Sequence, residues 1–520
     1  MSEQITSNLP SVTRTDVDAH AVRNGFVETM LSSRRLLILV FMFVIFAAAL
    51  KPIKDPDFYW HLKTGQYLLE TRTIPSVDMF SWTKFGSEWI THEWLSEAVM
   101  YSVFSWLGYG GLIVLFAGII MATFKIVYRR CQEVVGHPYV GGFVLLLGAA
   151  ATMPTWGVRP QMFSMLFASV FVFVLGDYYR DRRTKMIWWL IPLTILWVNM
   201  HAGFAMGLAL IAFTMVSLIV DAVLLSEQPF ALLWRRVRTL LVLLISCGAA
   251  VCVNPSGTRL YSYPLETLRS QAMMQYIQEW KSPNFHEPMF QPLALFVLLT
   301  LGVLALSHKR VRPGELVLLL VMTFATLRSS RNVPFLVLIA IPIVAESLWS
   351  WVVNQSWGLR FTVDEKREFG RGSVVKLLLN ITILLLCPLT VIAIRVGDSV
   401  EKQFITEAKN YPVAAVDFIS SHKLPQPIYN EYVWGGYLIW RLYPEYRVNM
   451  DGRADVYGDE LIEEFLSVHD GEPKWRDSLN RQGVRTVLLK PDVPLASLLR
   501  DDTAWQKVFE DKWSVIFVRK

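Results

Sequence analysis

Residues 36–61 read LLILVFMFVIFAAALKPIKDPDFYWH, an apolar run that ends in two acids, three aromatic side chains and a histidine. The apolar part, residues 36–53, is long enough to cross the roughly 30 Å of hydrocarbon in a membrane, so it predicts an uncleaved first span. Two arginines precede this run directly. Because arginine and lysine favour the cytoplasmic side of a span, we expect residues 1–33 to form a cytoplasmic tail. The two acids, Asp55 and Asp57, would then lie just outside the opposite face.

The composition of the whole chain agrees with a membrane protein. The 520 residues are 53% hydrophobic and 18% charged, whereas an ordinary soluble domain is about 25% charged. The mean hydropathy is +0.36. These values exclude a soluble enzyme, a disordered chain and a fibrous repeat. The net charge of +6 does not indicate a nucleic-acid partner, because the basic residues form short clusters between apolar runs.

Ten further apolar runs predict, with the first, about eleven transmembrane helices within residues 34–396. These runs cover residues 109–128, 139–156, 160–177, 186–200, 203–224, 239–254, 290–307, 314–327, 333–352 and 376–396. Every second connection is basic, and these clusters fall within residues 129–130, 180–185, 235–238, 309–312 and 366–376. Positive charge favours the cytoplasmic side, so these connections are expected inside and the first loop, residues 54–95, outside.

An odd number of spans places the rest of the chain, residues 397–520, on the outer side. Short β-type runs alternate there with helical patterns, which predicts a small extracytoplasmic α/β domain. The expected strands are residues 427–429, 446–449, 486–489 and 515–518, and the clearest helices are residues 414–421 and 459–468.

Unusual polar side chains gather at the outer ends of the spans. Besides the two acids, these candidate substrate-binding residues are Trp60, His61, His92, Glu93, Arg159, Asn199, His201, Glu279, Arg328, Arg331 and Asn332. Any one of them could be an ordinary helix cap or interfacial anchor. As a set they differ from the cytoplasmic ends, which carry mostly plain arginine and lysine clusters. Because polar and ionisable groups at membrane depth are costly, we interpret the set as an outward-facing site.

Two segments of the first loop have residue types found in metal sites. His92-Glu93 lacks the second histidine of a zinc-protease helix. The pair Asp55 and Asp57 could bind a divalent cation such as Mg²⁺ or Mn²⁺, with His61, His92 or Glu93 completing the site, because hard cations prefer carboxylate oxygens. Capping of the next helix by the two acids is an equally good interpretation.

Several motifs together resemble the C-type glycosyltransferase superfamily, which includes protein O-mannosyltransferases and lipid A aminoarabinose transferases. The chain shares with it Asp-x-Asp after the first span, a long Trp-rich first loop, about eleven spans and a soluble outer domain. The sequence is similar, more closely, to a bacterial set of uncharacterised membrane proteins. That similarity rests on the run 55–65, Ile74-Pro75, Asp78, Phe80-Ser81, His92-Glu93-Trp94-Leu95, Arg159-Pro160-Gln161, Asn199-Met200-His201, Asn254-Pro255, Glu279-Trp280, Arg331-Asn332, Trp434-Gly435-Gly436-Tyr437 and Asp451-Gly452-Arg453.

The superfamily resemblance implies transfer of a sugar from a polyprenyl-phosphate carrier to a lipid, glycan or protein acceptor outside the membrane, with inversion. It also implies that an acid of the first loop, Asp55 or Asp57, is the base. The superfamily usually places its two acids adjacent or nearly so, whereas Pro56 separates them here, so the choice between them stays open. The bacterial kin group implies a location in the inner membrane.

The residue types suit this chemistry. A carboxylate can remove the proton of an attacking hydroxyl, and arginine grips phosphate oxygens with two hydrogen bonds, which makes Arg159, Arg328 and Arg331 candidates for the leaving phosphate. Trp60 could stack on a sugar or form part of the interfacial belt. A transporter or lipid flippase, and a non-catalytic scaffold that presents the outer domain, are the alternatives. We expect the outer domain to modulate the handling of acceptor or product.

Overall fold

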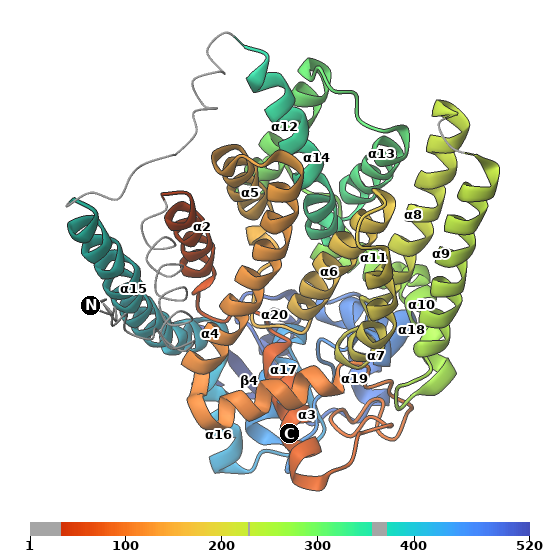
Figure 1. Ribbon diagram of the computed structural model, residues 1–520. Coiled ribbons are helices and arrows are strands. Elements are labelled where there is room, and N and C mark those ends of the chain that lie inside the picture. Colours follow the sequence, from red (N-terminus) through yellow and green to blue (C-terminus); the bar gives the residue numbers. More distant parts are fainter. Residues whose placement is uncertain (1–32, 227–228, 356–371) are drawn as a thin grey trace, which may run out of the picture.

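The structure is a computed structural model that describes residues 33–226, 229–355 and 372–520. The expected cytoplasmic tail, residues 1–33, lies outside this part except for its last residue. The basic cluster at residues 366–376 lies mostly outside it as well. Figure 1 shows a bundle of long helices, with the first loop and the C-terminal domain gathered at one end of the bundle.

Each apolar run of the sequence overlaps one helix of this bundle. The helices are α2 (Ser33–Ala49), α4 (Trp94–Val135), α5 (Pro138–Thr152), α6 (Gln161–Tyr179), α7 (Leu190–Met200), α8 (Phe204–Leu225), α9 (Phe230–Ala250), α12 (Gln291–Leu306), α13 (Pro313–Arg328), α14 (Val333–Val353) and α15 (Gly372–Asn410).

Six helical segments of the described chain are long and apolar enough to cross a membrane. They are Trp94–Val135, Pro138–Thr155, Gln161–Tyr179, Phe204–Leu225, Pro288–Leu306 and Ser330–Val353. Other helices of the bundle are shorter or more charged: α7 has 11 residues, and α9 carries three arginines near its start. The expected helical membrane architecture is confirmed, whereas the number of eleven spans stays a prediction.

The first loop joins the bundle through two helices. Helix α3 (Phe58–Thr71) begins directly after Asp57, and α4 begins at Trp94. Gly108 has φ 60° and ψ −156°, a conformation that only glycine adopts without strain. It divides α4 into a first part, which packs against α3, and the part that overlaps the second expected span.

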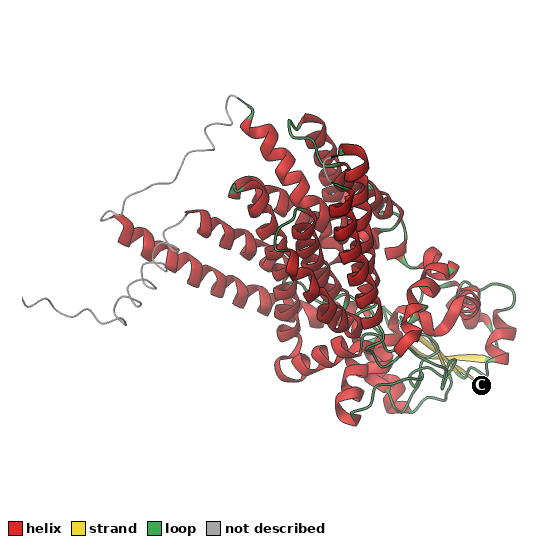
Figure 2. Ribbon diagram, turned by 45° about the vertical axis from the view of Figure 1, so that its right-hand side comes forward, coloured by secondary structure: helices red, strands yellow, loops and turns green. Residues whose placement is uncertain are grey.

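The C-terminal domain contains one four-stranded sheet, which Figure 2 shows beside the end of the helical bundle. The strands are β1 (Ile428–Asn430), β2 (Thr486–Leu489), β3 (Trp505–Glu510) and β4 (Val515–Arg519), in the order β1-β2-β4-β3. β1 and β2 are parallel, and the other two pairs are antiparallel. The helices are α16 (Val413–His422), α17 (Gly435–Leu442), α18 (Ala454–His469), α19 (Trp475–Arg481) and α20 (Pro494–Asp501).

Two expectations for this domain are corrected. The strand expected at residues 446–449 is wrong: Val448 forms only an isolated bridge with Ser81 of the first loop, so this segment pairs outside the sheet. The strand β3 was not expected, because it is an edge strand whose side chains are mostly exposed and mixed in polarity. Helix α15 also continues through residues 397–410, which the sequence analysis assigns to the outer domain.

The C-terminal domain shares a core with the rest of the protein. Phe58 and Phe80 of the first loop belong to the same buried apolar cluster as Trp434 and Tyr437 of the C-terminal domain. This shared packing fixes the position of the domain over the first loop, where the two acids lie.

Candidate active site at one end of the helical bundle

Asp55 and Asp57 lie in the segment that leads from α2 into α3. The Oδ1 atom of Asp55 accepts a hydrogen bond of 3.0 Å from the backbone N–H of Asp57, and its Oδ2 atom lies 2.9 Å from Nε of Arg159. Asp57 occupies the N-cap position of α3, but its side chain accepts no capping hydrogen bond there. The capping interpretation therefore fails for Asp57, and the Asp55 carboxylate is held from two sides.

Arg159 connects Asp55 to a second acid. It precedes α6, and its guanidinium also pairs with Glu279 in the short helix η4 (Gln278–Trp280). Burial lowers the pKa of Arg159, but the carboxylates of Asp55 and Glu279 outweigh that effect and raise it above the usual value. The positive charge of Arg159 is therefore largely compensated by these two acids.

Arg331 lies in the neighbouring short helix η6 (Ser330–Asn332), half-buried, with its guanidinium 4.9 Å from the ring centroid of Trp280. Burial raises the pKa of Glu279, but the charges of Arg159 and Arg331 hold it below its usual value. Within the described ranges, Arg331 forms no ion pair with a carboxylate. It is therefore the less compensated of the two arginines.

Two other predicted residues, both asparagines, form hydrogen bonds that connect neighbouring segments, and a third is exposed. Nδ2 of Asn332 donates to the carbonyl of Ala325 at 3.0 Å and so secures the end of α13. Asn199 accepts from the Trp94 indole at 2.9 Å and donates to the carbonyl of Val253 at 2.8 Å, which joins three segments. Arg328 is exposed.

The ring of Trp60 is buried and covered rather than open to a ligand. It lies 3.7 Å from the ring centroid of His61 and 6.3 Å from that of Trp89. Gly436 of the C-terminal domain covers it as well, because a Cβ atom at that glycine would lie 3.3 Å from Cδ1 of Trp60.

Three histidines surround the carboxylate of Glu93. Its Oε2 atom lies 3.6 Å from Nδ1 of His61, and its Oε1 atom lies 3.6 Å from Nε2 of His92 and 3.4 Å from Nε2 of His201. His61 also contacts Glu97, with 3.1 Å between Nδ1 and Oε1. Burial raises the pKa of Glu93, but His92 and His61 together hold it far below its usual value.

The neutral form of His201 is favoured by its surroundings. Its Nδ1 atom accepts from the backbone N–H of Gly203 at 2.8 Å and lies 2.8 Å from the hydroxyl of Ser164. Burial, together with the charge of Arg331, lowers the pKa of His201 to about 3, although Glu93 opposes this. Nε2 therefore carries the proton and faces Glu93.

The C-terminal domain reaches the carboxylate pair, which the sequence did not predict. A methyl group at Gly452 would lie 2.6 Å from Cγ of Asp57, and one at Gly436 would lie 2.8 Å from the carbonyl oxygen of Pro56. The chain thus approaches the pair as closely as glycine permits. Burial and the neighbouring Asp55 carboxylate raise the pKa of Asp57 to about 7.

An ion pair fixes this approach. Arg453, which follows Gly452, is buried; its Nη1 atom lies 2.8 Å from Oδ1 of Asp78 in the first loop, and its Nη2 atom lies 2.7 Å from Oδ2 of Asp451. Its guanidinium also lies 4.5 Å from the ring centroid of Trp89. The segment Asp451-Gly452-Arg453, which has the composition of a turn, is therefore the anchor between the domain and the first loop.

A cavity of about 480 Å³ opens beside this anchor. Its walls come from residues 88–90 of the first loop, from the start of α18, and from α10 (Tyr263–Arg269) and α11 (Gln271–Tyr276). Asp455 is exposed to it, and Tyr263, whose ring lies 4.4 Å from that of His92, lines it. Gly452, Tyr263 and Glu97 were not predicted as site residues. Gly452 had a signal, in the segment 451–455, whose Asp451, Arg453 and Asp455 the sequence offers as a polar group.

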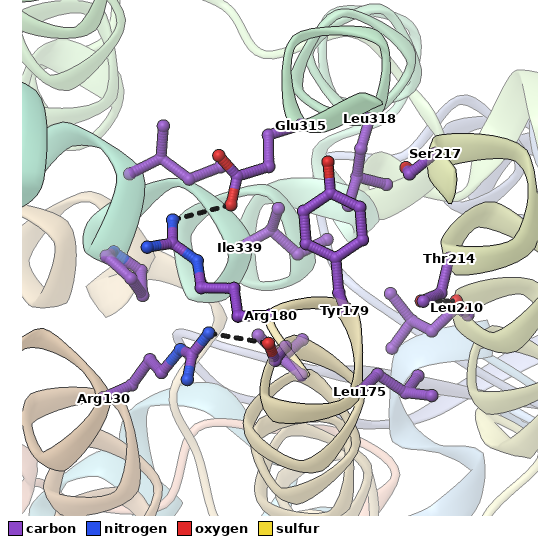
Figure 3. A pocket seen from close by; sticks show the side chains of 14 residues that line it. Arg130, Leu175, Tyr179, Arg180, Leu210, Thr214, Ser217, Glu315, Leu318 and Ile339 are labelled. Atoms are coloured by element: carbon purple, nitrogen blue, oxygen red, sulfur yellow. Dashed lines mark hydrogen bonds and ion pairs between the residues drawn. The ribbon is translucent and has the colours of Figure 1, made fainter. Parts of the chain in front are cut away.

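A second cavity, at the opposite end of the helices, has a different character (Figure 3). Arg180 lies 2.7 Å from Glu315 there, and Arg130 lies 2.6 Å from Asp177 and donates to the carbonyl of Gly176 at 2.8 Å. Carboxylates thus neutralise both arginines of this cavity.

No family model and no curated protein matches the sequence. Solved structures do match. The oligosaccharyltransferase AglB from Archaeoglobus fulgidus, solved with an inhibitory peptide and a dolichol-phosphate, is 11% identical, with a TM-score of 0.53 over 87% of this chain and 69% of AglB. The arabinofuranosyltransferase AftD from Mycobacteria is 14% identical, with a TM-score of 0.52 over 94% of this chain and 40% of AftD. ArnT from Cupriavidus metallidurans, solved with undecaprenyl phosphate, is 16% identical, with a TM-score of 0.48 over 95% of this chain and 98% of ArnT.

The first two matches show that this multi-pass membrane protein has the fold of the C-type glycosyltransferases. The resemblance found in the sequence is confirmed at the level of the fold.

Proposed function

We propose that the protein is a membrane glycosyltransferase that moves a sugar from a polyprenyl-phosphate carrier to an acceptor at the outer face of the membrane, with inversion. The observation that carries this proposal is the site itself. Asp57, with its raised pKa, lies beside the Asp55–Arg159–Glu279 chain of ion pairs, at the end of a glycosyltransferase fold that carries the C-terminal domain. The dolichol-phosphate in the AglB structure supports a lipid carrier of this class.

Asp57 is the better base of the two acids. Asp55 is engaged by Arg159 and by the backbone of Asp57, whereas no arginine or lysine pairs with Asp57 in the described part of the chain. A general base works best when its pKa lies near the operating pH, and burial moves that of Asp57 toward 7. Asp57 would take the proton of the acceptor hydroxyl. The hydroxyl oxygen of the acceptor attacks the anomeric carbon of the sugar, and the carrier phosphate leaves.

Arg331 is the proposed partner of that phosphate. Its guanidinium has no ion-pair partner among the described residues, whereas that of Arg159 already forms ion pairs with two carboxylates. A guanidinium that stacks on an aromatic ring keeps its N–H groups free for an anion, and arginine binds phosphate with two hydrogen bonds. We therefore assign carrier binding to Arg331 and the positioning of Asp55 to Arg159.

The cavity beside Asp455 is the proposed entry for the acceptor. It is lined by acids, arginines and the rings of Trp89 and Tyr263, a mixture that suits a polar group with hydroxyls better than a lipid chain. The first loop, α10 and the C-terminal domain all contribute to it. The domain would then shape the acceptor site directly, in addition to the expected modulation of substrate handling.

The proposed location is a bacterial inner membrane, with the amino terminus inside and the C-terminal domain outside. The basic clusters at residues 129–130, 180–185, 235–238 and 309–312 lie toward the bundle end opposite to the domain, in agreement with positive charge inside. A divalent cation between Asp55 and Asp57 is not part of the proposal. Arg159 already pairs with Asp55, and Gly452 fills the space on one side of the half-buried Asp57.

The test is a donor assay. Protein in lipid nanodiscs is incubated with a panel of labelled polyprenyl-phosphate sugars and an extract of cell-envelope acceptors, and release of the polyprenyl phosphate is measured. We expect one donor to be consumed by the wild type and not by Asp57→Asn. The matched control Asp398→Asn changes a partly exposed aspartate of α15 that pairs with Lys402, and it should consume the donor normally. Consumption by none of the sugars, or equal consumption by Asp57→Asn, would contradict the proposal.

A further inference from the structure

His61, Glu93 and Glu97 form a cluster that the transfer reaction does not use. One ligand atom from each side chain can be chosen so that all three lie within 4.8 Å of one another. Nδ1 of His61 lies 3.1 Å from Oε1 of Glu97 and 3.6 Å from Oε2 of Glu93. In a tetrahedral metal site with bonds of about 2.1 Å, neighbouring ligand atoms are about 3.4 Å apart. The two pairs that include His61 therefore already have the spacing of metal ligands.

One oxygen of this cluster has no partner. Glu97 is fully buried, and its second carboxylate oxygen, Oε2, has no hydrogen-bond partner among the residues that the structure describes. An ionised carboxylate would need a donor at this oxygen, and a protonated one would need an acceptor. Buried polar atoms without partners are uncommon in folded proteins and call for an explanation such as a bound ion.

The other oxygen of Glu93 is held from the side away from this cluster. His92 and His201 both face Oε1 of Glu93, whereas Oε2 faces His61. Groups that orient a ligand from its far side are a regular feature of metal sites. The two histidines would thus fix the direction of the Glu93 carboxylate without binding the ion.

The backbone also brings the three ligands together before any ion binds. Gly65 lies one helical turn after His61 on α3, where a Cβ atom would come within 2.8 Å of both the carbonyl carbon of Glu97 and Cβ of Tyr101. The absence of a side chain at this position lets α3 and α4 approach each other closely. The approach places His61 of one helix against Glu97 of the other.

We propose that His61, Glu93 and Glu97 bind one divalent first-row transition-metal ion, such as Zn²⁺ or Mn²⁺. The imidazole ligand favours Zn²⁺ over Mg²⁺ and Ca²⁺, which prefer oxygen ligands alone, and the two carboxylates also suit Mn²⁺. The site is separate from Asp55 and Asp57 and contains neither acid. Because His61 lies one turn after Asp57 on α3, the ion would hold the helix that carries the base against α4.

The experiment measures bound metal, so it depends on no step of the transfer reaction. Protein purified through a tag without histidine is stripped with a chelator, desalted, loaded with Zn²⁺ alone or Mn²⁺ alone, and desalted again. Bound ions per chain are counted by mass spectrometry, and the melting temperature is recorded with and without each ion. The exposed residue Cys252 could hold Zn²⁺ weakly, which is why the Mn²⁺ arm is included.

We expect about one ion per chain in the wild type and less than a tenth of that in Glu97→Gln and in His61→Gln. The matched control Glu70→Gln, which changes an exposed glutamate on the same helix α3, should keep the ion and the melting shift that it causes. Asp57→Asn should keep the ion too. His61→Gln leaves both carboxylates in place, so it tests the site even if Glu97→Gln does not fold.

Two results would overturn the proposal. One is a stripped and reloaded wild type without bound ion, which would mean that His61 shares a proton with the two glutamates instead. The other is loss of the ion from Asp57→Asn with retention in Glu97→Gln, which would place it at the carboxylate pair. A negative donor assay with a positive ion count would contradict the transferase proposal and leave the metal site standing.

Discussion

Gly452 packs against the carboxylate of Asp57 so closely that a methyl group on it would stand 2.6 Å from Cγ of Asp57. About 400 positions separate the two residues in the sequence. This contact makes the C-terminal domain one wall of the carboxylate site. It also removes water from Asp57, which is the main cause of its raised pKa.

The first prediction concerns this contact. Gly452→Ala should reduce sugar transfer strongly, by roughly the 10² or more that loss of a positioned base costs, because the new methyl group must displace Asp57 or the segment around Arg453. The measurement is donor consumption, with folding checked by size-exclusion chromatography. The control is Gly302→Ala, where a Cβ atom meets nothing within 4 Å. Normal transfer by Gly452→Ala would contradict the close contact between Gly452 and the carboxylate of Asp57.

The helical bundle could be predicted because its signals are local. Each apolar run overlaps a helix, and a basic cluster stands in every second connection, which predicts that these connections share one side of the membrane. That sidedness also placed Asp55, Arg159, Glu279 and Arg331 in one region, which the structure brings together.

The rest of the site depends on contacts between distant segments. Glu97 lies in the first turn of α4, whose sequence is typical of a segment that leads into a span. Nothing in the sequence therefore marked Glu97 as a ligand. Asn199 and Asn332 show the converse difficulty: asparagine at a helix end suits either a cap or a ligand, and here both side chains bind backbone carbonyls. A tryptophan ring such as that of Trp60 is suited to stacking on a sugar, but here the C-terminal domain covers it.

A second prediction separates two neighbouring arginines. Arg331→Ala should weaken binding of the polyprenyl-phosphate carrier by about tenfold or more, because it removes the less compensated cation of the site. Arg328→Ala serves as the matched control, since that side chain is exposed and should change binding little. Carrier binding is measured by titration of the nanodisc protein with a fluorescent polyprenyl phosphate. Equal effects of the two substitutions would argue for a general electrostatic attraction instead.

A third prediction concerns pH and the stability of the C-terminal domain. Burial lowers the pKa of His469, but Glu431, whose carboxylate lies 3.3 Å from Nε2, and Asp470 raise it above the usual value. The folded state therefore binds this proton more tightly than the unfolded chain does. The stabilisation is fully present below the unfolded pKa of about 6.5 and is lost as the pH rises through the higher folded pKa.

The measurement compares melting temperatures at pH 6 and pH 9. His469→Gln should melt a few degrees below the wild type at pH 6, and the gap should shrink at pH 9. The control His422→Gln changes an exposed histidine at the end of α16 and should show no such pH dependence. A gap that grows toward pH 9 would mean that the neutral imidazole is the stabilising form.

The last prediction tests which acid is the base. Asp57→Asn keeps the size of the side chain but removes the proton acceptor, so transfer should fall by about 10² to 10⁴ while carrier binding is preserved. Asp55→Asn should lose less in rate, because Asp55 acts through its pairing with Arg159 and its hydrogen bond to the backbone of Asp57. Single-turnover transfer and carrier titration, measured on the same preparations, separate the two effects. A larger rate loss in Asp55→Asn, with Asp57→Asn near normal, would reverse the assignment and make Asp57 the residue that positions the base.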